Sequence, residues 1–204
     1  MTDGVTDTVR SLVIGERWAR DAARWETMLE CFHDDSVVDI SWVRASGPEF
    51  VEASRASFEA GIRSAHVLGP VTVEVDADRA TADVGTLIEV QVELRGTLCA
   101  LSVFARLVER LERREGEWGI SELTAVYHFD KLAAVIPGEP LEVSRDAVAR
   151  YRPSYRMLSH WVAETQGAAA VRPELPGIDR PDLVDELYRR NAAWLHRDPR
   201  SARV

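Results

Sequence analysis

Asp21 and His66 are the two residues in this sequence best suited to acid–base chemistry. Asp21 lies between Trp18 and Trp25 at helical spacing, on a stripe of apolar side chains that is expected to face the core. A carboxylate there must be hydrogen-bonded or paired, because burial of an isolated charge is costly. His66 comes just before a predicted sheet, and imidazole titrates near neutral pH. We therefore hypothesise that Asp21 orients and charges His66, which acts as a general base.

Both residues also have a purely structural interpretation. An Asp at a junction between helices is often the N-cap of the second helix, which Ala22 and Ala23 would open here. A His in a loop often does no more than hydrogen-bond to the backbone. Residue types and spacing alone leave these alternatives open.

The elements that must position the two residues follow from hydrophobic periodicity. Residues 7–32 have helical spacing with a break near Asp21, residues 36–43 form a strand, and Pro48 begins a helix that ends near Gly61. Alternating apolar residues then predict antiparallel strands separated by short turns, at 71–75, 80–94, 97–111 and 118–129. Helices followed by a meander of strands predict an α+β fold, in which the helices pack on a curved sheet.

A Gly/Pro cluster at Gly138-Glu139-Pro140 marks a domain boundary. We expect one domain over residues 1–137 and a helical C-terminal extension over residues 138–204. Helical spacing recurs in the extension over 145–161 and 181–194. These two helices are expected to cover the mouth of a pocket as a lid or to extend a dimer interface.

Several short motifs, taken in order, resemble those of one family. They are Trp18-x-x-Asp21-x-x-x-Trp25, Cys31-Phe32-His33-Asp34-Asp35 before a strand, His66 before Gly69-Pro70-Val71, and the segment 111–118 before the last strand. Over residues 8–137 the sequence resembles SnoaL-like proteins of the nuclear transport factor 2-like superfamily. The resemblance implies a cone-shaped α+β barrel, in which N-terminal helices pack on a strongly bent antiparallel sheet around a deep apolar pocket.

The same resemblance implies an activity and a site. Enzymes of the superfamily include scytalone dehydratase, a hexachlorocyclohexane dehydrochlorinase, bile-acid dehydratase, steroid isomerase and polyketide cyclases. In its dehydratase-like members an Asp at the helix junction and a His before the sheet form the catalytic dyad. By position these are Asp21 and His66, so the resemblance favours the catalytic interpretation of both.

The sequence departs from the family pattern at the partners of the dyad. Several relatives carry a Tyr or Lys on the first helix, where this chain offers Glu16, Arg17 and Arg20. Many carry an Arg on the last strand, which this chain lacks. His128 and Glu122 lie on that strand, and either is a candidate substitute.

The remaining candidate site residues are aromatic or lie near the expected pocket. We expect five residues to bind the substrate: Trp18, Trp42, Phe104, Tyr127 and His128. The expected ligand is a hydrophobic small molecule of cyclic or polyketide type.

Composition excludes several other classes of protein. The net charge of −9 argues against nucleic-acid binding. No apolar run is long enough for a membrane span or a signal peptide, so we expect a cytoplasmic protein. The two cysteines do not form a disulfide framework. The five histidines have no metal-ligand spacing, and no glycine-rich phosphate loop appears, so we expect neither a metal nor another cofactor.

The function predicted at this point is a cofactor-independent lyase or isomerase, dehydratase-like, acting through the Asp21–His66 dyad. The alternatives are a polyketide cyclase, a non-catalytic small-molecule binding protein of the same fold, and a non-catalytic subunit of a ring-hydroxylating oxygenase. We expect a homodimer or a higher homo-oligomer.

Overall fold

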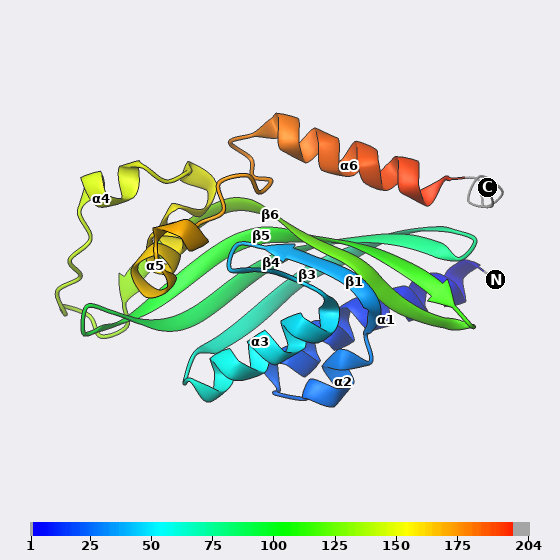
Figure 1. Ribbon diagram of the computed structural model, residues 1–204, viewed down its shortest axis with the longest axis horizontal. Helices are drawn as coiled ribbons and strands as arrows, with labels where there is room; N and C mark the ends of the chain where they lie inside the picture. The colour runs from blue at the N-terminus through cyan, green and yellow to red at the C-terminus, as the bar shows by residue number, and fades with distance from the viewer. Residues whose placement is uncertain (1, 198–204) are drawn as a thin grey trace.

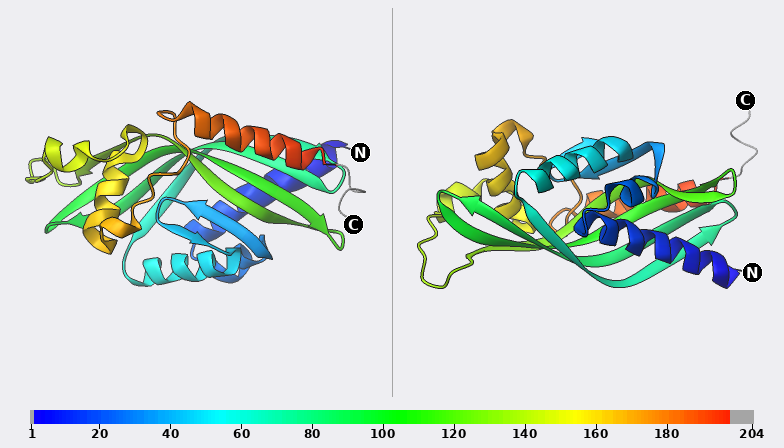
Figure 2. Two further views of the ribbon diagram at one scale, coloured as in Figure 1. Left: turned by 45° about the horizontal axis from the view of Figure 1, so that its top comes forward. Right: turned by 90° about the horizontal axis from the view of Figure 1, so that it is seen from below.

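A computed structural model of the protein describes residues 2–197 and shows one curved sheet with helices on both faces (Figure 1). Helices α1 (Thr2–Asp21), α2 (Trp25–Leu29) and α3 (Gly47–Glu59) lie on one face, and α6 (Pro181–Leu195) lies on the other. Figure 2 shows this arrangement from two further directions. The predicted α+β class with helices packed on a strongly curved sheet is confirmed, and the sheet does not close into a full barrel.

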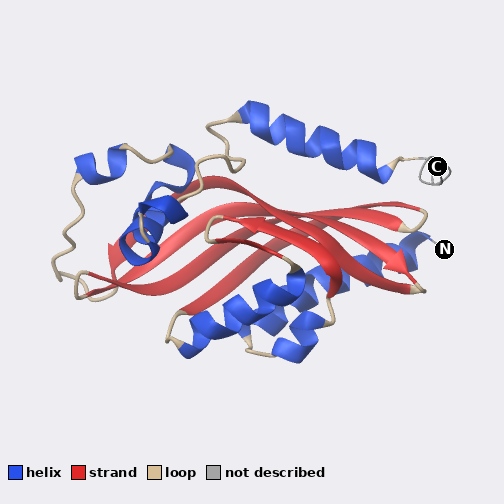
Figure 3. Cartoon of the chain, viewed as in Figure 1, coloured by secondary structure: helices blue, strands red, loops and turns tan. Residues whose placement is uncertain are grey.

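The sheet has six strands in the order β2-β1-β6-β5-β4-β3. All neighbours are antiparallel except β1 and β6, which run parallel. Four long strands make up most of the sheet, and β1 and β2 extend its edge (Figure 3). The strands are β1 (Phe32–Ile40), β2 (Val43–Ala45), β3 (Arg63–Asp76), β4 (Arg79–Leu94), β5 (Thr97–Arg114) and β6 (Glu117–Ala134).

The long strands are joined by short turns, as the sequence predicts, and in the structure each turn has two residues. Arg95 and Gly96 have φ angles of 51° and 82°, and Glu115 and Gly116 have 54° and 96°. Two consecutive positive φ angles are what a type I′ turn requires, and this turn matches the right-handed twist of the strands on either side. The turns therefore fix the register of β4 with β5 and of β5 with β6.

His66 lies inside β3 rather than in a loop before the sheet. Strand β3 begins at Arg63, earlier than the alternation of Val71, Val73 and Val75 predicts, and His66 pairs with Ile88 of β4. The backbone hydrogen bonds of a sheet hold this position more firmly than a loop would.

The first two helices meet close to the predicted break, but Asp21 does not cap the second one. Asp21 is the last residue of α1, Ala23 turns the chain with a φ of 54°, and α2 begins at Trp25 after Arg24. The side chain of Asp21 is therefore free of any capping role at α2.

The main core lies between the concave face of the sheet and helices α1 and α3. Phe50 of α3 and Val9 and Val13 of α1 are completely buried against the sheet. A smaller apolar cluster on the opposite face packs α6 against the sheet through Val108, Val126 and Leu187. In the described part of the chain, no helix has the length and hydropathy that a membrane crossing requires.

The C-terminal region is helical, as predicted, but its first helix is broken. The expected helix over 145–161 is divided into α4 (Arg145–Ala149), the 3-10 turn η1 (Pro153–Tyr155) and α5 (Arg156–Gln166), and a second 3-10 turn, η2 (Ala168–Ala170), follows. Pro153 accounts for the break, because proline lacks the backbone N–H that a continuous helix needs. Strand β6 ends at Ala134, close to the domain boundary predicted at residue 137, and that boundary stays a prediction.

Two glycines provide a matched test of this packing. A Cβ at Gly47 would lie 2.5 Å from the Cβ of Phe32, so Gly47→Ala is expected to lower the free energy of unfolding by about 1–3 kcal/mol. Gly15 lies inside α1 with nothing within 4 Å of its Cβ position, so Gly15→Ala is expected to raise it by about 0.5–1 kcal/mol. Urea denaturation measures both values, and equal effects of the two substitutions would contradict the packing described.

Candidate active site

Asp21 and His66 are in direct contact, joined by two hydrogen bonds. The backbone N–H of His66 donates to Oδ2 of Asp21 at 2.7 Å, and Nδ1 of the His66 ring lies 2.7 Å from Oδ1. One carboxylate thus binds both the backbone and the ring of the same residue. The pair joins the C-terminal end of α1 to β3, and the ring has little freedom to rotate.

Burial and neighbouring charges keep the His66 ring neutral. Its side chain is only 3% exposed, and burial lowers the pKa of His66 to about 4 even though the hydrogen bond to Asp21 acts to raise it. The nearby charges of Arg17 and Arg20 lower the pKa of His66 as well. At neutral pH the imidazole is therefore unprotonated, so Asp21 orients the ring but does not charge it, contrary to the second part of the hypothesis.

Asp21 is ionised at the same pH. Partial burial acts to raise the pKa of Asp21, but the hydrogen bonds from the ring and backbone of His66, together with the charge of Arg20, outweigh it, so that the net shift is downward. A carboxylate only accepts hydrogen bonds, so the ring proton of His66 belongs on Nδ1. The lone pair is consequently on Nε2, the nitrogen on the other side of the ring.

His66 lines a deep pocket between the sheet, the N-terminal helices and α5. The pocket has a volume of about 860 Å³ including its open mouth. Strands β1, β4, β5 and β6 and helices α3 and α5 supply most of its wall, and β3 contributes Ser64 and His66. The wall is mostly apolar. Its apolar side chains are Ile40, Trp42, Phe50, Ile62, Ile88, Val90, Val103, Leu107, Leu123, Ala125, Leu158 and Trp161. An apolar wall weakens the solvation of any charge inside and strengthens its interaction with fixed charges.

Two arginines from α1 also line the pocket. Arg17 donates through Nε and Nη2 to both carboxylate oxygens of Glu16, and this ion pair is buried. Arg20 donates through Nη1 to Oγ of Ser64 at 2.7 Å and, at 3.4 Å, through Nε to Oγ of Ser54. The pocket is thus apolar with a cationic region beside the dyad.

A second buried acid lies close to the Glu16–Arg17 pair. Glu109 of β5 is 0% exposed, and burial together with the charge of Glu16 raises its pKa to about 8, although Arg17 opposes the shift. At neutral pH Glu109 carries its proton. Arg17 is therefore balanced by one carboxylate, that of Glu16, and not by two.

Comparison with known proteins gives the family. A model of the SnoaL-like domain matches residues 6–124, which is more than half of the chain and includes both members of the dyad. The chain belongs to the SnoaL-like family.

Two proteins of the fungus Fusarium vanettenii are similar along almost the whole chain. Pea pathogenicity protein 2 is 28% identical over 196 residues, covering 92% of this chain and 84% of its own length. A PEP2-like protein is 25% identical over 202 residues, covering 94% and 86%. These matches extend well beyond residue 124 into the C-terminal region, so this region is a feature that the SnoaL-like protein shares with them.

Solved structures share the fold at low sequence identity. The hexachlorocyclohexane dehydrochlorinase LinA-type3 of Novosphingobium barchaimii has a TM-score of 0.53 and 18% identity, over 65% of this chain and 92% of that one. A candidate scytalone dehydratase of Novosphingobium aromaticivorans has a TM-score of 0.55 and 13% identity, over 71% of this chain and all of that one. At these identities the comparison establishes the fold alone.

The structure brings some of the predicted binding residues to the pocket and leaves others outside. Trp42 and Tyr127 line it, and the hydroxyl of Tyr127 accepts a hydrogen bond from the backbone N–H of Ser41 at 2.8 Å. Trp18 is 59% exposed on the outer side of α1. Phe104 stacks on Phe129 with ring centroids 4.5 Å apart, away from the pocket wall.

The two candidate substitutes on the last strand are not among the pocket-lining residues. Glu122 forms ion pairs with Arg110 at 2.7 Å and with Arg190 of α6 at 2.5 Å, on the face of the sheet that α6 covers. His128 is near Arg106 and Asp83, whose charges act on its pKa from the same face. The cations that accompany the dyad come from α1 instead.

Sequence reasoning named Arg17 and Arg20 but assigned them no role, and it missed the serines of the pocket. Both arginines lie within one helical turn of Asp21, which is the signal that could have placed them beside the dyad. Ser41, Ser57 and Ser64 line the pocket too, and no pattern in the sequence distinguishes them from other serines. Among residues 2–197, no group of three or more His, Cys, Asp or Glu side chains is arranged to hold a metal ion.

Helix α5 forms one side of the pocket through Leu158, Trp161 and Gln166, whereas α6 does not reach it. Of the two expectations for the C-terminal helices, a cover over the pocket therefore fits α5. The backbone N–H of Leu158 donates to Asp130 of β6 at 2.7 Å, which ties the beginning of α5 to the sheet.

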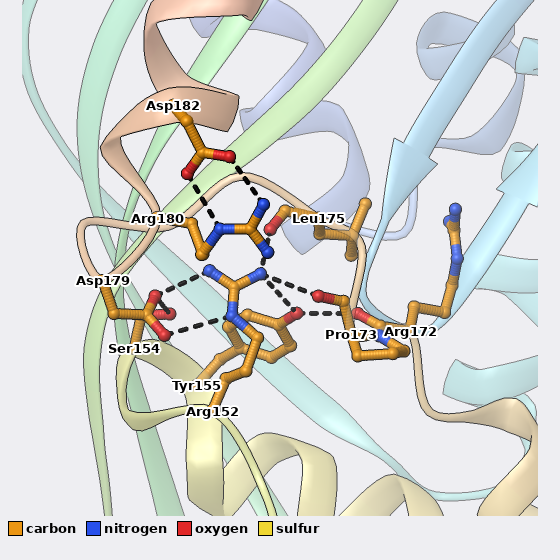
Figure 4. Close-up of polar contacts among 9 residues, drawn as sticks. All are labelled: Arg152, Ser154, Tyr155, Arg172, Pro173, Leu175, Asp179, Arg180 and Asp182. Atoms are coloured by element: carbon orange, nitrogen blue, oxygen red, sulfur yellow. Dashed lines mark hydrogen bonds and ion pairs between the residues drawn. The ribbon is translucent and has the colours of Figure 1, made fainter.

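A network around Arg152 holds this region in place (Figure 4). Its guanidinium donates to both carboxylate oxygens of Asp179 and to the backbone carbonyls of Pro173 and Leu175. The hydroxyl of Tyr155 donates to the carbonyl of Arg172 at 2.7 Å. Residues 172–179 are thereby fixed beside η1, the turn from which α5 begins.

The same segment is attached to the pocket wall. The N–H of Tyr127 donates to the carbonyl of Pro176 at 3.0 Å, and the N–H of Ile178 donates to the carbonyl of Tyr127 at 2.9 Å. Arg172 donates to the carbonyl of Ile40 at 3.0 Å. Tyr127 and Ile40 both line the pocket, so the C-terminal region supports its wall directly.

The state of the dyad can be measured directly. Because burial and two arginines depress the pKa of His66, its ring resonances are expected to titrate with a midpoint near pH 4 in an NMR titration. In Asp21→Asn the midpoint is expected to fall further, because the carboxylate that favours the imidazolium is gone. The exposed His196, whose pKa is raised by Asp76, serves as an internal reference. A His66 midpoint at the ordinary value of 6.5 would show that the ring is not held as described.

Proposed function

We propose that this protein is a cofactor-independent lyase or isomerase that removes a proton from a carbon next to a carbonyl group of a cyclic or polyketide-type small molecule. The single observation that supports this most is the neutral His66 ring, held at Nδ1 by an ionised Asp21, on the wall of a deep apolar pocket. This arrangement gives His66 one basic nitrogen, Nε2, with which to act on a bound molecule.

In the proposed reaction Nε2 of His66 takes the proton, and the C–H electron pair moves into the substrate. The imidazolium that forms is stabilised by the carboxylate of Asp21, which is already in hydrogen-bonding position and need not reorganise. The apolar wall strengthens that attraction. His66 then returns the proton, either to another carbon, which gives isomerisation, or to a leaving hydroxide, which gives dehydration.

The arginines of α1 complement this chemistry. Electron density that leaves the C–H bond accumulates on the carbonyl oxygen, and the nearest fixed positive charges to His66 are Arg17 and Arg20. Their position on the pocket wall suits them to stabilise that charge. They take the place of the last-strand Arg that many family members have.

The comparisons support elimination chemistry. Two solved structures with this fold are described as a dehydrochlorinase and a candidate scytalone dehydratase, and both descriptions denote eliminations. A polyketide cyclase would share the first step, because it also begins with proton removal next to a carbonyl. The product then depends on the substrate, which supplies either a leaving group or a second carbonyl.

The proposal is tested by proton exchange, which needs no knowledge of the physiological substrate. The wild-type protein is expected to accelerate exchange of the α protons of cyclic ketones such as 2-tetralone in deuterated water, followed by NMR. His66→Ala removes the base and Asp21→Asn removes its partner, so each is expected to lower the rate by about 10²- to 10⁴-fold.

The matched control is His128→Gln, which changes a histidine on the other face of the sheet and is expected to keep the wild-type rate. If His66→Ala exchanged protons as fast as the wild type, the dyad would not be the base. If no cyclic ketone or β-hydroxyketone in a panel reacted faster with the wild type than without protein, the binding-protein alternative would replace the proposal.

A further inference from the structure

The charge on the pocket wall has the opposite sign from that of the protein as a whole. The chain has a net charge of −9, yet the residues that line the pocket include Arg17 and Arg20 and neither an Asp nor a Glu. The only other ionisable lining groups are His66, which is neutral, and Tyr127, whose pKa burial raises to about 12. The charged side chains that line the pocket are therefore both cations, and the carboxylates beside them are not among the lining residues.

The two arginines differ in how they are neutralised. Arg17 is bound by both oxygens of Glu16, which is the fork-to-fork arrangement that satisfies a guanidinium best. Arg20 has no such partner among the described residues. Its hydrogen bonds go to the hydroxyls of Ser54 and Ser64, both neutral.

The nearest carboxylate to Arg20 is already engaged. Oδ1 of Asp21 lies 3.8 Å from Nη1 of Arg20, too far for a hydrogen bond. Both oxygens of Asp21 accept hydrogen bonds from His66 at 2.7 Å. The charge of Asp21 attracts Arg20, but the carboxylate accepts no hydrogen bond from the N–H groups of Arg20.

Arg20 is consequently a partly buried cation with donors to spare. A guanidinium has five N–H donors, and the two serines use two of them. Its side chain is only 13% exposed, so water solvates it poorly, and burial lowers the pKa of Arg20 to about 10. Asp21 offsets the charge of Arg20 only across 3.8 Å, so the remaining N–H groups of the guanidinium are available to an anion in the pocket.

We infer that the pocket binds an apolar molecule that carries an anionic oxygen, and that Arg20 is the residue that binds this oxygen. The apolar wall takes the body of the molecule, and the oxygen pairs with the free N–H groups of Arg20 next to Nε2 of His66. The inference rests on the proposed function for the reaction, but the binding of the anion is independent of it. The substrate class becomes a hydrophobic acid, with its charge bound before any proton moves.

Matched ligands test the inference. Isothermal titration calorimetry compares 2-naphthoate with 2-naphthamide, and benzoate with benzamide; within each pair the ring is the same and only the charge differs. Each carboxylate is expected to bind the wild type about 10- to 100-fold more tightly than its amide, which is the range for a hydrogen bond to a charged group. Arg20→Gln is expected to bring the ratio close to one, and Arg20→Lys to retain part of it, because the cation remains but its fork geometry is lost.

The control is Arg55→Gln, which removes the same charge from the exposed side of α3 and is expected to leave the ratio unchanged. A second readout is the His66 ring. Because Arg17 and Arg20 lower its pKa, bound 2-naphthoate is expected to raise the midpoint of the His66 NMR titration, and 2-naphthamide is not.

The outcomes separate this inference from the proposed function. If the carboxylates bind selectively but no ketone exchanges protons, the protein binds acids without the proposed chemistry and the inference stands. If exchange occurs but no carboxylate binds more tightly than its amide, the chemistry stands and the inference is wrong. Selectivity that survives in Arg20→Gln also contradicts it, because another group would then bind the anion.

Discussion

The two hydrogen bonds from His66 to Asp21 are the interaction on which the rest of this structure depends. One carboxylate binds the backbone of β3 and the ring of the same residue, so the end of α1 is fixed against the sheet at the point where the chemistry is proposed. A ring held this way has a defined tautomer and a defined direction for Nε2. The contacts that join α1 to the sheet are therefore the same ones that orient the proposed base.

Burial of charge is the second constraint. Glu16, Arg17 and Glu109 are all buried, an unusual concentration of ionisable groups for the interior of a small domain. The structure accommodates them by pairing Glu16 with Arg17 and by keeping a proton on Glu109. Burial lowers the pKa of His66, and the charges of Arg17 and Arg20 lower it further. The polar interior thus acts both on the proposed base and on the pocket in which a ligand is proposed to bind.

The C-terminal region completes the pocket. The family model ends at residue 124, yet α5 forms one side of the cavity, and the Arg152 network joins the segment after it to the wall at Tyr127 and Ile40. The similarity of two fungal proteins along almost the whole chain indicates that this region belongs with the cone. An extension of this kind closes an apolar pocket without altering the sheet that carries the dyad.

The sequence by itself determined the α+β class, the long hairpins with their two-residue turns, the break at Asp21 and the pairing of Asp21 with His66. Periodicity and turn chemistry are local signals, and the dyad became visible through family resemblance. The inward face of α1 was decided by the tertiary structure. Apolar spacing placed Trp18 inward, but Trp18 is exposed and the Glu16–Arg17 pair is buried instead. Two charges that neutralise each other can enter a core. Hydrophobic periodicity counts each of them as a polar residue and so places them outside. Phe104 lies away from the pocket because it alternates with Val103 and Leu107, which line it. Tertiary structure likewise decided the places of Glu122 and His128: two bulges in β6, at Ser121 and at His128, shift the alternation of side chains, and no local pattern announces them.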